Sequence, residues 1–231
     1  MKIISYNIND SNPRKIEQLL GMQADVLVVP EITCPEDAHL PDHLDMKWYG
    51  IEYNYHGKRW KGLGVIWQKG NGFVPEWFNP ELTYGIPLIV DEYLILGIWP
   101  TKTDANEPQS YPQIAQDIIK EYAPHFKDYK TLVIGDFNCY VKQYDATKQY
   151  GDILRVNELL ESYGLHSLYH QQTGEEFGHE TRATYFHRFN GTAPFFLDYA
   201  YTSFPVASFQ MFPWDKVMSD HVGMEVICES D

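Results

Sequence analysis

The sequence predicts a layered α/β fold in which most strands run antiparallel. Short runs of β-branched and other apolar residues, separated by turn residues, outnumber the segments with helical periodicity. The three helical segments occur singly between groups of strands, with no linker, low-complexity segment or close internal repeat. With 231 residues, 44% of them hydrophobic, the chain is long enough to bury a substantial core, and we expect a single domain over residues 1–231.

The first expected strand, Lys2–Ile8, ends in a polar segment that includes Asn7. A helix is expected next, because Asn12 is a suitable N-cap and Pro13 suits the first helical turn. The second expected strand, Asp25–Glu31, contains four apolar residues in a row. Such a run indicates that both faces of the strand are buried.

The middle of the chain is expected to form several strands with turn residues between them. These strands are Met46–Tyr53, Leu63–Gln68, Gly72–Phe78, Ile86–Val90 and Tyr93–Trp99. A second helix should begin at Ser110, which is placed to form a capping box with Gln113.

A buried strand is expected at Thr131–Ile134, and it should stop at Gly135, where the backbone turns freely. A third helix is expected over Asp152–Tyr163, with Gly164 as its C-cap, and a polar loop over Gln171–Thr181. The remaining expected strands are Ala183–His187, Phe195–Ser203 and Val222–Cys228.

Asp136, Phe137 and Asn138 follow the strand that ends at Gly135. In an extended backbone, alternation places Asp136 and Asn138 on one face and Phe137 on the other. An acid and an amide side by side could hold a water or a metal ion against a phosphate. The alternative is an Asp/Asn-rich turn between strands, which is a common use of these residues.

The formal net charge of −14 bears on the partners of the protein. A protein that holds duplex DNA by general electrostatics usually has a basic face. We therefore expect either a small substrate or a local contact strengthened by a divalent cation. Acidic clusters suit Mg²⁺, because hard cations prefer oxygen ligands.

The chain has no run of 18 apolar residues and no signal-peptide pattern at its start, so we expect no membrane span and no export. Its three cysteines, Cys34, Cys139 and Cys228, show no C-x-x-C spacing. This argues against a disulfide scaffold and against structural zinc, and it favours a cytoplasmic location. No obligate protein partner is indicated.

One segment concentrates basic residues around a tryptophan: Lys58, Arg59, Trp60 and Lys61. Lysine and arginine beside an aromatic ring can hold phosphates and stack a base, and Arg182 is a further candidate for phosphate binding. The alternative for the first segment is a solvated hairpin loop, and for Arg182 a solvated loop position.

Polar residues recur at strand ends or within apolar strands in five short motifs. In chain order these are Ser5-Tyr6-Asn7, Pro30-Glu31, Gly135-Asp136-Phe137-Asn138, Leu197-Asp198-Tyr199 and Ser219-Asp220-His221. Over residues 3–226 this order resembles the endonuclease/exonuclease/phosphatase superfamily, which includes DNase I-like and exonuclease III-like proteins. The resemblance implies a four-layer α/β sandwich of two packed mixed, mostly antiparallel sheets with helices on the outer faces, and an active site at one end.

The resemblance also implies a metal site. Glu31 would be the main Mg²⁺ ligand, with Asn7 beside it, and Asp220 would complete the acidic site. Mn²⁺ is the alternative cation. Oxygen ligands of this kind suit both cations.

Four further residues receive roles in catalysis from the resemblance. Asp136 would orient or deprotonate the attacking water, and Asn138 would hydrogen-bond a phosphate oxygen. His221 would contact the scissile phosphate, and Asp198 would hold its ring. The chemistry supports these roles, because phosphoryl hydrolysis needs an in-line nucleophile and stabilised phosphate charge. An acid in an apolar run such as that around Asp198 also needs a buried partner.

Two positions depart from the pattern of the family. Ile98 stands where nuclease relatives carry a catalytic Tyr or His, so one auxiliary acid or phosphate contact is expected to be missing. Pro30 replaces the glutamine that often precedes the metal-binding glutamate.

These observations favour a Mg²⁺-dependent phosphodiester hydrolase, a nuclease acting on DNA or RNA. One alternative is a phosphatase or phosphodiesterase of a small phosphorylated molecule, such as a nucleotide, inositol phosphate or lipid headgroup. A second alternative is a catalytically silent binding module. The retention of the acids, Asn138 and His221 argues against silence.

Overall fold

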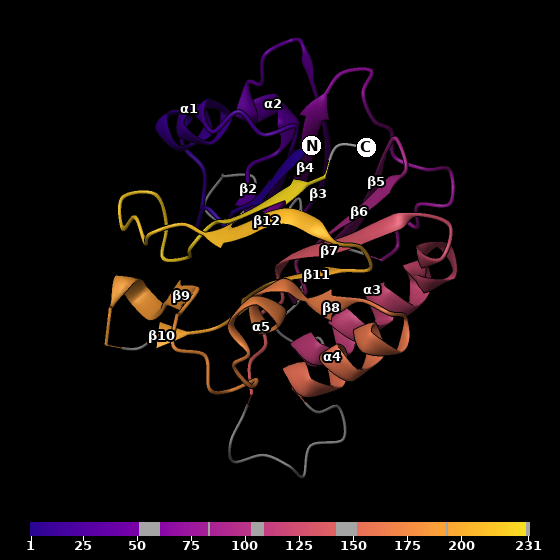
Figure 1. Ribbon diagram of the computed structural model, residues 1–231. Helices are drawn as coiled ribbons and strands as arrows, with labels where there is room; N and C mark the ends of the chain where they lie inside the picture. Colours follow the sequence, from indigo (N-terminus) through magenta and orange to yellow (C-terminus); the bar gives the residue numbers. More distant parts are fainter. Residues whose placement is uncertain (51–60, 83, 103–108, 142–151, 193, 230–231) are drawn as a thin grey trace.

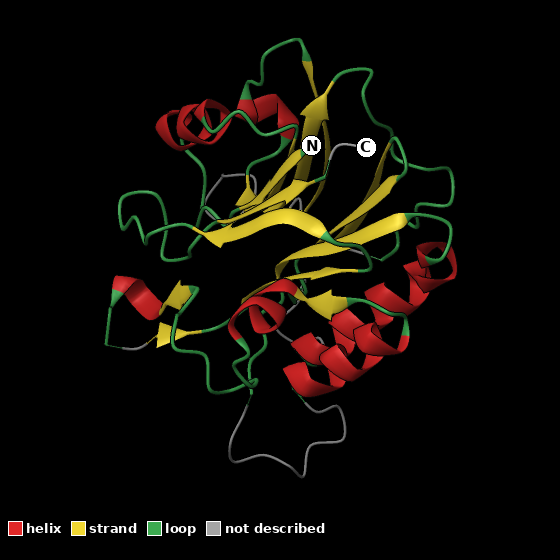
Figure 2. Cartoon of the chain, viewed as in Figure 1, coloured by secondary structure: helices red, strands yellow, loops and turns green. Residues whose placement is uncertain are grey.

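Two mixed β-sheets packed against each other form the middle of the fold, and helices cover their outer faces (Figures 1 and 2). The computed structural model describes residues 1–50, 61–82, 84–102, 109–141, 152–192 and 194–229. The predicted four-layer α/β sandwich is confirmed. Within the described part of the chain, no helix is long and apolar enough to cross a membrane.

Within the described ranges, the first sheet has six strands in the order β12-β13-β1-β2-β4-β3. Their bounds are β1 Lys2–Ser5, β2 Val26–Ile32, β3 Leu44–Gly50, β4 Gly62–Gln68, β12 Val206–Met211 and β13 Met224–Cys228. Among the described residues of this sheet, only the β1–β2 pair is parallel. Helices α1 (Pro13–Gly21) and α2 (Pro35–Ala38) lie on its outer side (Figure 1).

In the part of the chain that the structure describes, the second sheet has five strands in the order β5-β6-β7-β11-β8, and one pair, β6–β7, is parallel. Their bounds are β5 Gly85–Val90, β6 Tyr93–Ile98, β7 Lys130–Asp136, β8 His166–Ser167 and β11 Asp198–Thr202. The helices beside this sheet are α3 (Tyr111–Phe126), α4 (Ile153–Ser162) and α5 (Leu168–Thr173) (Figure 1).

A separate hairpin pairs β9 (Tyr185–Phe186) with β10 (Pro194–Phe195), and the turn η1 (His187–Phe189) lies between the two strands. Tyr185 bridges to His221, and the Phe186 backbone N–H donates to the Asp220 carbonyl at 2.7 Å. The hairpin therefore fixes the segment that leads into β13.

Alternation along β1 and β2 divides the apolar residues between two cores. Ile3 and Val28 face the second sheet, whereas Ile4 and Leu27 belong to the core that includes Leu19 of α1. All of Val26–Val29 is buried, as the continuous apolar run predicted. The sheets approach closely at Gly97 of β6, where an added Cβ would lie 2.9 Å from a Val65 methyl carbon.

Helix α1 begins as predicted, because the Asn12 side chain accepts a hydrogen bond from the Lys15 backbone N–H at 3.0 Å. Helix α3 also begins after Ser110, but that side chain makes no capping hydrogen bond, so the predicted capping box is wrong. Helix α4 has Asp152 as its N-cap, and Gly164 follows in the left-handed region with φ +77°.

Several predicted strands differ from the structure. The strand predicted at Gly72–Phe78 is wrong, since only Phe73 bridges to β5 and the chain turns after Pro75, which has no N–H for a ladder. β12 was missed, because it is an edge strand with exposed residues and lacks a strong apolar pattern. Helix α5 occupies the start of the predicted loop Gln171–Thr181, and Gly174 with φ +72° ends it.

Other strands begin or end at residues that differ from the prediction. β1 stops at Ser5 rather than Ile8, and Asn9 and Asp10 adopt positive φ. The range Phe195–Ser203 divides into the end of β10 and β11. β3 is described to Gly50, so the end of the predicted Met46–Tyr53 strand lies outside the described residues. The remaining strands and the third helix shift by a few residues or less, a usual uncertainty for element ends.

β7 does not stop at Gly135 but continues to Asp136. Gly135 pairs with Ile98 of β6 and with Tyr199 of β11. A Cβ at Gly135 would lie 1.9 Å from the Ile98 carbonyl oxygen. The glycine therefore permits close backbone contact at the strand end, where a side chain would force the strands apart.

Replacing Gly135 with Ala should lower the free energy of unfolding by about 2 kcal/mol or more, because the clash is with backbone rather than a flexible side chain. Urea denaturation would measure this change. Gly21→Ala at the end of α1, where nothing lies within 4 Å of the added Cβ, is the matched control and should be neutral or stabilising. An equal stability of Gly135→Ala and the parent protein would contradict the steric argument.

Candidate active site

Polar side chains from both sheets meet at one edge of the sandwich. Asn7 follows β1, Glu31 lies near the end of β2, and Asp136 is the last residue of β7. Asp198 begins β11 and pairs with Asp136 across the sheet, and His221 lies just before β13. Except for the half-buried Glu31, these residues are buried. The parallel pairs β1–β2 and β6–β7 direct their carboxyl ends to this edge.

His221 and Asp198 form a buried pair. The His221 Nδ1 lies 2.9 Å from the Asp198 Oδ2. This supplies the buried partner that the sequence required for Asp198. The Thr184 hydroxyl oxygen accepts the Asp198 backbone N–H at 3.0 Å, which holds the start of β11 in place.

The His221 ring is held as an imidazolium. Burial alone would lower its pKa, but the carboxylates of Asp198 and Asp136 outweigh burial and raise the pKa to about 10. Because the folded state binds this proton more tightly, the interaction stabilises the fold below the ordinary histidine pKa of 6.5. That contribution is lost as the pH rises through about 10.

The Nε2 side of His221 points toward the other polar groups. Asp136 Oδ2 lies 3.9 Å from Nε2, beyond hydrogen-bond distance. Asn7 Nδ2 lies 3.3 Å from Nε2, but it is also a donor and cannot accept a proton from the imidazolium. The Nε2–H is therefore placed to donate to an incoming oxygen rather than to either of these neighbours.

The carboxamide of Asn7 connects the acids of the two sheets. Its Nδ2 donates to Asp136 Oδ2 at 2.9 Å and to Glu31 Oε1 at 3.2 Å. Its Oδ1 accepts the Asn9 backbone N–H at 2.9 Å. Reversing the amide would lose these bonds, so Asn7 presents nitrogen rather than a metal-binding oxygen to Glu31.

Asp136 is enclosed at the end of β7. Its Oδ1 accepts the Asn138 backbone N–H at 2.9 Å, and Oδ2 is held by Asn7. Burial raises the pKa of Asp136, and the nearby charge of Asp198 raises it further, although His221 acts in the opposite direction. A carboxylate with a raised pKa is a better proton acceptor near neutral pH than an ordinary surface aspartate.

Asn138 reaches the site by a turn, which corrects the predicted strand alternation. Its φ is +51°, and its N–H bond to the Asp136 side chain forms an Asx-type turn. The Asn138 side chain is half-buried, and its Nδ2 donates to the Pro100 carbonyl at 3.1 Å. The segment Asp136–Asn138 therefore forms the Asp/Asn-rich turn that was the alternative interpretation of the sequence. This turn lies at the polar edge.

Glu31 occupies a special backbone position. It has φ +64° and lies where the β2–β4 register shifts between Val29 and Ile32. A positive φ is costly for a glutamate and is typical of functional sites. The Oε1 atom contacts Asn7, while Oε2 forms an ion pair with the Lys61 ammonium.

Ser219 and Tyr185 also hold the site, although sequence reasoning assigned no separate role to either. The Ser219 hydroxyl donates to the Asn7 carbonyl at 2.6 Å and accepts the His221 backbone N–H at 3.0 Å. The centroid of the Tyr185 ring lies 4.6 Å from that of His221. The serine in the Ser219-Asp220-His221 motif could have been recognised as a loop-fixing residue, whereas nothing in the sequence indicated the ring contact.

The donor chemistry of this edge fits a divalent cation. Asp136, Asp198 and His221 place one ligand atom each within 4.8 Å of one another and could hold a metal ion. His221, however, already uses Nδ1 for Asp198 and carries a proton. Glu31 also offers carboxylate oxygens, which a hard cation prefers, and Asp220 is a buried acid next to His221 in the chain.

The predicted phosphate-binding residues are not all brought to this edge. Lys58, Arg59 and Trp60 lie outside the described residues, whereas Lys61 pairs with Glu31. Arg182 donates to the Met211 carbonyl at 3.2 Å, so it ties the hairpin region to β12.

Ile98 is fully buried at the end of β6. It packs in the core and offers no acid group. This is consistent with the expected loss of an auxiliary contact at that position.

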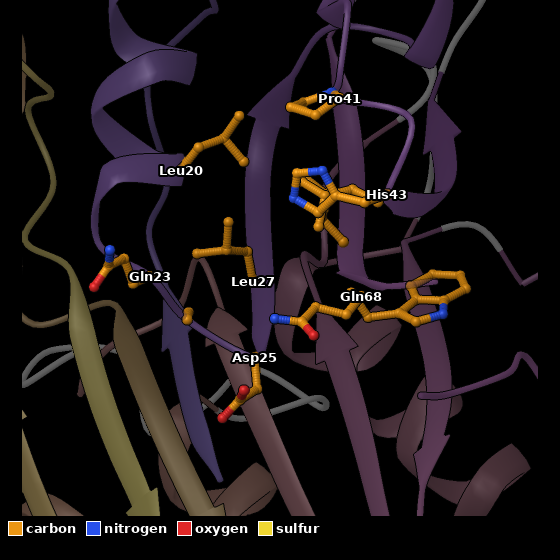
Figure 3. Close-up of a pocket in the computed structure, with 11 residues that line it drawn as sticks. Leu20, Gln23, Asp25, Leu27, Pro41, His43 and Gln68 are labelled. Atoms are coloured by element: carbon orange, nitrogen blue, oxygen red, sulfur yellow. The ribbon is translucent and has the colours of Figure 1, made fainter. Parts of the chain in front are cut away.

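A separate hollow of about 400 Å³ lies on the outer face of the first sheet (Figure 3). It is lined by Leu20, Leu27 and His43, among others, and by Asp25, which directly precedes β2. Glu31 lies at the other end of β2. The hollow is therefore distinct from the polar edge and contributes none of its residues.

Comparison with protein families identifies the class of protein. The chain matches the model of the Endonuclease/Exonuclease/phosphatase family over residues 4–221. It belongs to this family, whose members hydrolyse phosphoric esters and are generally dependent on divalent metals. It is therefore a phosphoric ester hydrolase of the nuclease and phosphatase class. Comparison with the sequences of curated proteins gives no match.

Solved structures share the fold at low sequence identity. The 3' phosphatase NExo from Neisseria, in a structure bound to product DNA hairpin, has 15% identity and a TM-score of 0.68. An AP endonuclease from Archaeoglobus fulgidus has 14% identity and a TM-score of 0.69. Each comparison covers 100% of both chains. The similarity to these proteins is one of fold.

Replacing Asp198 with Asn should lower the pKa of His221 by about two pH units, because the adjacent negative charge is lost while burial remains. An NMR titration of the His221 ring in the metal-free protein would measure this. Asp91→Asn, at an exposed position, should leave the His221 pKa unchanged. An unaltered His221 pKa in the Asp198 variant would refute the assignment of Asp198 as the main source of the raised pKa.

Proposed function

We propose that this protein is a Mg²⁺-dependent phosphodiesterase that cleaves DNA or RNA. The observation that carries the proposal is the edge at which Asp136 and the His221–Asp198 pair meet Glu31 through Asn7. This edge brings together a carboxylate that can accept a proton, a cationic hydrogen-bond donor and a carboxylate that can bind a metal ion. The NExo structure is described as bound to a product DNA hairpin, which makes DNA the first substrate to test.

In the proposed reaction, Asp136 positions a water molecule and accepts its proton. Both Asp136 oxygens already receive one hydrogen bond, which fixes the orientation of the carboxylate. The His221 Nε2–H donates to a non-bridging phosphate oxygen, and Asp198 keeps the ring charged and oriented. Asn138 supplies its second amide hydrogen to a phosphate oxygen, since the first is used by Pro100.

The residues that would hold the cation are Glu31 and Asp220, with Asn7 beside them. When bound, Mg²⁺ or Mn²⁺ would neutralise developing charge on the phosphate oxygens. The Asn7 amide orients Glu31 by a hydrogen bond, so Asn7 acts through this carboxylate as a positioning residue. The Lys58–Lys61 segment and Arg182 remain candidates for contacts with a longer substrate.

We also propose that residues 1–231 form one domain, since one apolar core includes residues of both sheets. The cytoplasmic location expected from the cysteines stays a prediction. Cys34, Cys139 and Cys228 are all buried.

Hydrolysis should require Mg²⁺ or Mn²⁺ and stop in EDTA, because the phosphate charge needs a cation. Single-stranded DNA, duplex DNA, RNA and bis-p-nitrophenyl phosphate form the substrate panel. Glu31→Gln should lose activity, whereas the exposed Glu76→Gln should retain it. Cleavage of the small diester alone would favour a small-molecule phosphodiesterase, and full activity in EDTA would contradict the proposal.

His221→Gln and Asp136→Asn should each lower kcat/KM by about 10²- to 10⁴-fold, because each removes a proton-transfer or phosphate-binding group. Steady-state kinetics on the preferred substrate would measure the loss, with circular dichroism to confirm folding. His166→Gln and Asp91→Asn make the same chemical changes at exposed positions and should be near normal. Near-normal turnover in either site variant would overturn its assigned role.

A further inference from the structure

Lys61 occupies a position that the proposed reaction does not yet explain. Its ammonium forms an ion pair with Oε2 of Glu31, the proposed metal ligand, whereas Asn7 contacts the other oxygen, Oε1. The side chains of Lys61 and Glu31 are 25% and 17% exposed, so the pair is partly shielded from water. A shielded ion pair is screened less by salt than a surface pair.

The place of Lys61 is set by the first sheet. It immediately precedes β4, and the next residue, Gly62, pairs with Ile32 just beyond Glu31. The register therefore brings the lysine opposite the end of β2. The contact follows from strand pairing as well as from charge attraction.

A second lysine near the site, Lys15, forms hydrogen bonds with backbone carbonyls instead. The Lys15 ammonium donates to the carbonyls of Asn9 and Asp10 at 3.1 and 3.0 Å, and also to that of Ile8. The negative charge of Glu31 acts to raise the pKa of Lys15. Among the described residues, however, Lys15 and Glu31 do not form an ion pair. Among the residues that the structure describes, Lys61 is thus the cation that forms an ion pair with Glu31.

We propose that Lys61 is a built-in counter-ion that exchanges with the divalent cation at Glu31. The ammonium and a dication repel each other and compete for the same carboxylate oxygen. Because the lysine stem is flexible, the ammonium can leave Oε2 when the metal binds. This inference rests on the proposed function, since it takes Glu31 as the metal ligand.

After displacement, the Lys61 ammonium remains beside the polar edge. Glu31, Asp136, Asp198 and Asp220 would otherwise repel an anionic phosphodiester. A cation held there by the strand register attracts the substrate phosphate at the rim of the site. Lys61 thereby opposes metal binding in the free protein and favours substrate binding in the metal-loaded enzyme.

The test is a calorimetric titration of the metal-free protein with Mn²⁺ alone. Lys61→Met should bind Mn²⁺ about three- to tenfold more tightly than the parent protein, because no ion pair has to be broken. Lys69→Met removes the same charge beyond the other end of β4, about 26 Å away by strand rise, and should not change the affinity. Lys61→Arg should keep the weaker binding of the parent.

Steady-state kinetics should show that the Lys61→Met variant binds substrate more weakly, although it binds Mn²⁺ more tightly. With saturating Mn²⁺, Lys61→Met should raise KM for the preferred substrate several-fold with a smaller change in kcat, whereas Lys69→Met should not. A purely structural role for Lys61 would instead weaken Mn²⁺ binding and substrate binding together. Equal or weaker Mn²⁺ binding by Lys61→Met, together with binding that still depends on Glu31, would overturn the counter-ion role alone.

Failure of the proposed function gives a different result. If Glu31→Gln leaves Mn²⁺ binding unchanged, Glu31 is not the metal ligand and both proposals are overturned. If Mn²⁺ binding depends on Glu31 and tightens in Lys61→Met, but no phosphodiester is cleaved, the ion exchange at Glu31 stands while the proposed reaction fails.

Discussion

The carboxamide of Asn7 forms hydrogen bonds with acids of both sheets at the polar edge, and the geometry of the site depends on these bonds. Its oxygen is fixed by the Asn9 N–H, so its nitrogen must face Glu31 of the first sheet and Asp136 of the second. Buried carboxylates lose water and need donors in its place. One planar amide that donates to both acids therefore sets the distance between the carboxylates of Glu31 and Asp136.

The same edge concentrates negative charge that the fold has to balance. Asp136 and Asp198 are direct neighbours in the β7–β11 register, and both are buried. The His221 imidazolium lies beside both acids, which explains its raised pKa despite burial. Lys61 performs a similar neutralising role at Glu31. The cost of burying like charges is thus offset by cations that also suit phosphate chemistry.

The sequence predicted those elements whose structure depends on local chemistry. The Asn12-Pro13 start of α1 and the buried run of β2 are confirmed. Both features depend on residues that are adjacent in the sequence. The predicted strand at Gly72–Phe78 and the missed β12 show the limit of such patterns. Whether a short apolar run becomes a strand depends on an available partner, which the run itself does not specify.

For the candidate site, the sequence alone determined which chemical groups are present and that an acid such as Asp198 required a partner. Tertiary structure decided which nitrogen of His221 meets that acid, that Asn138 arrives through a turn, and that Lys61 reaches Glu31. These features depend on strand register and backbone dihedrals between distant segments. Residue order encodes them only through the packing of the whole fold, and local spacing could not reveal them.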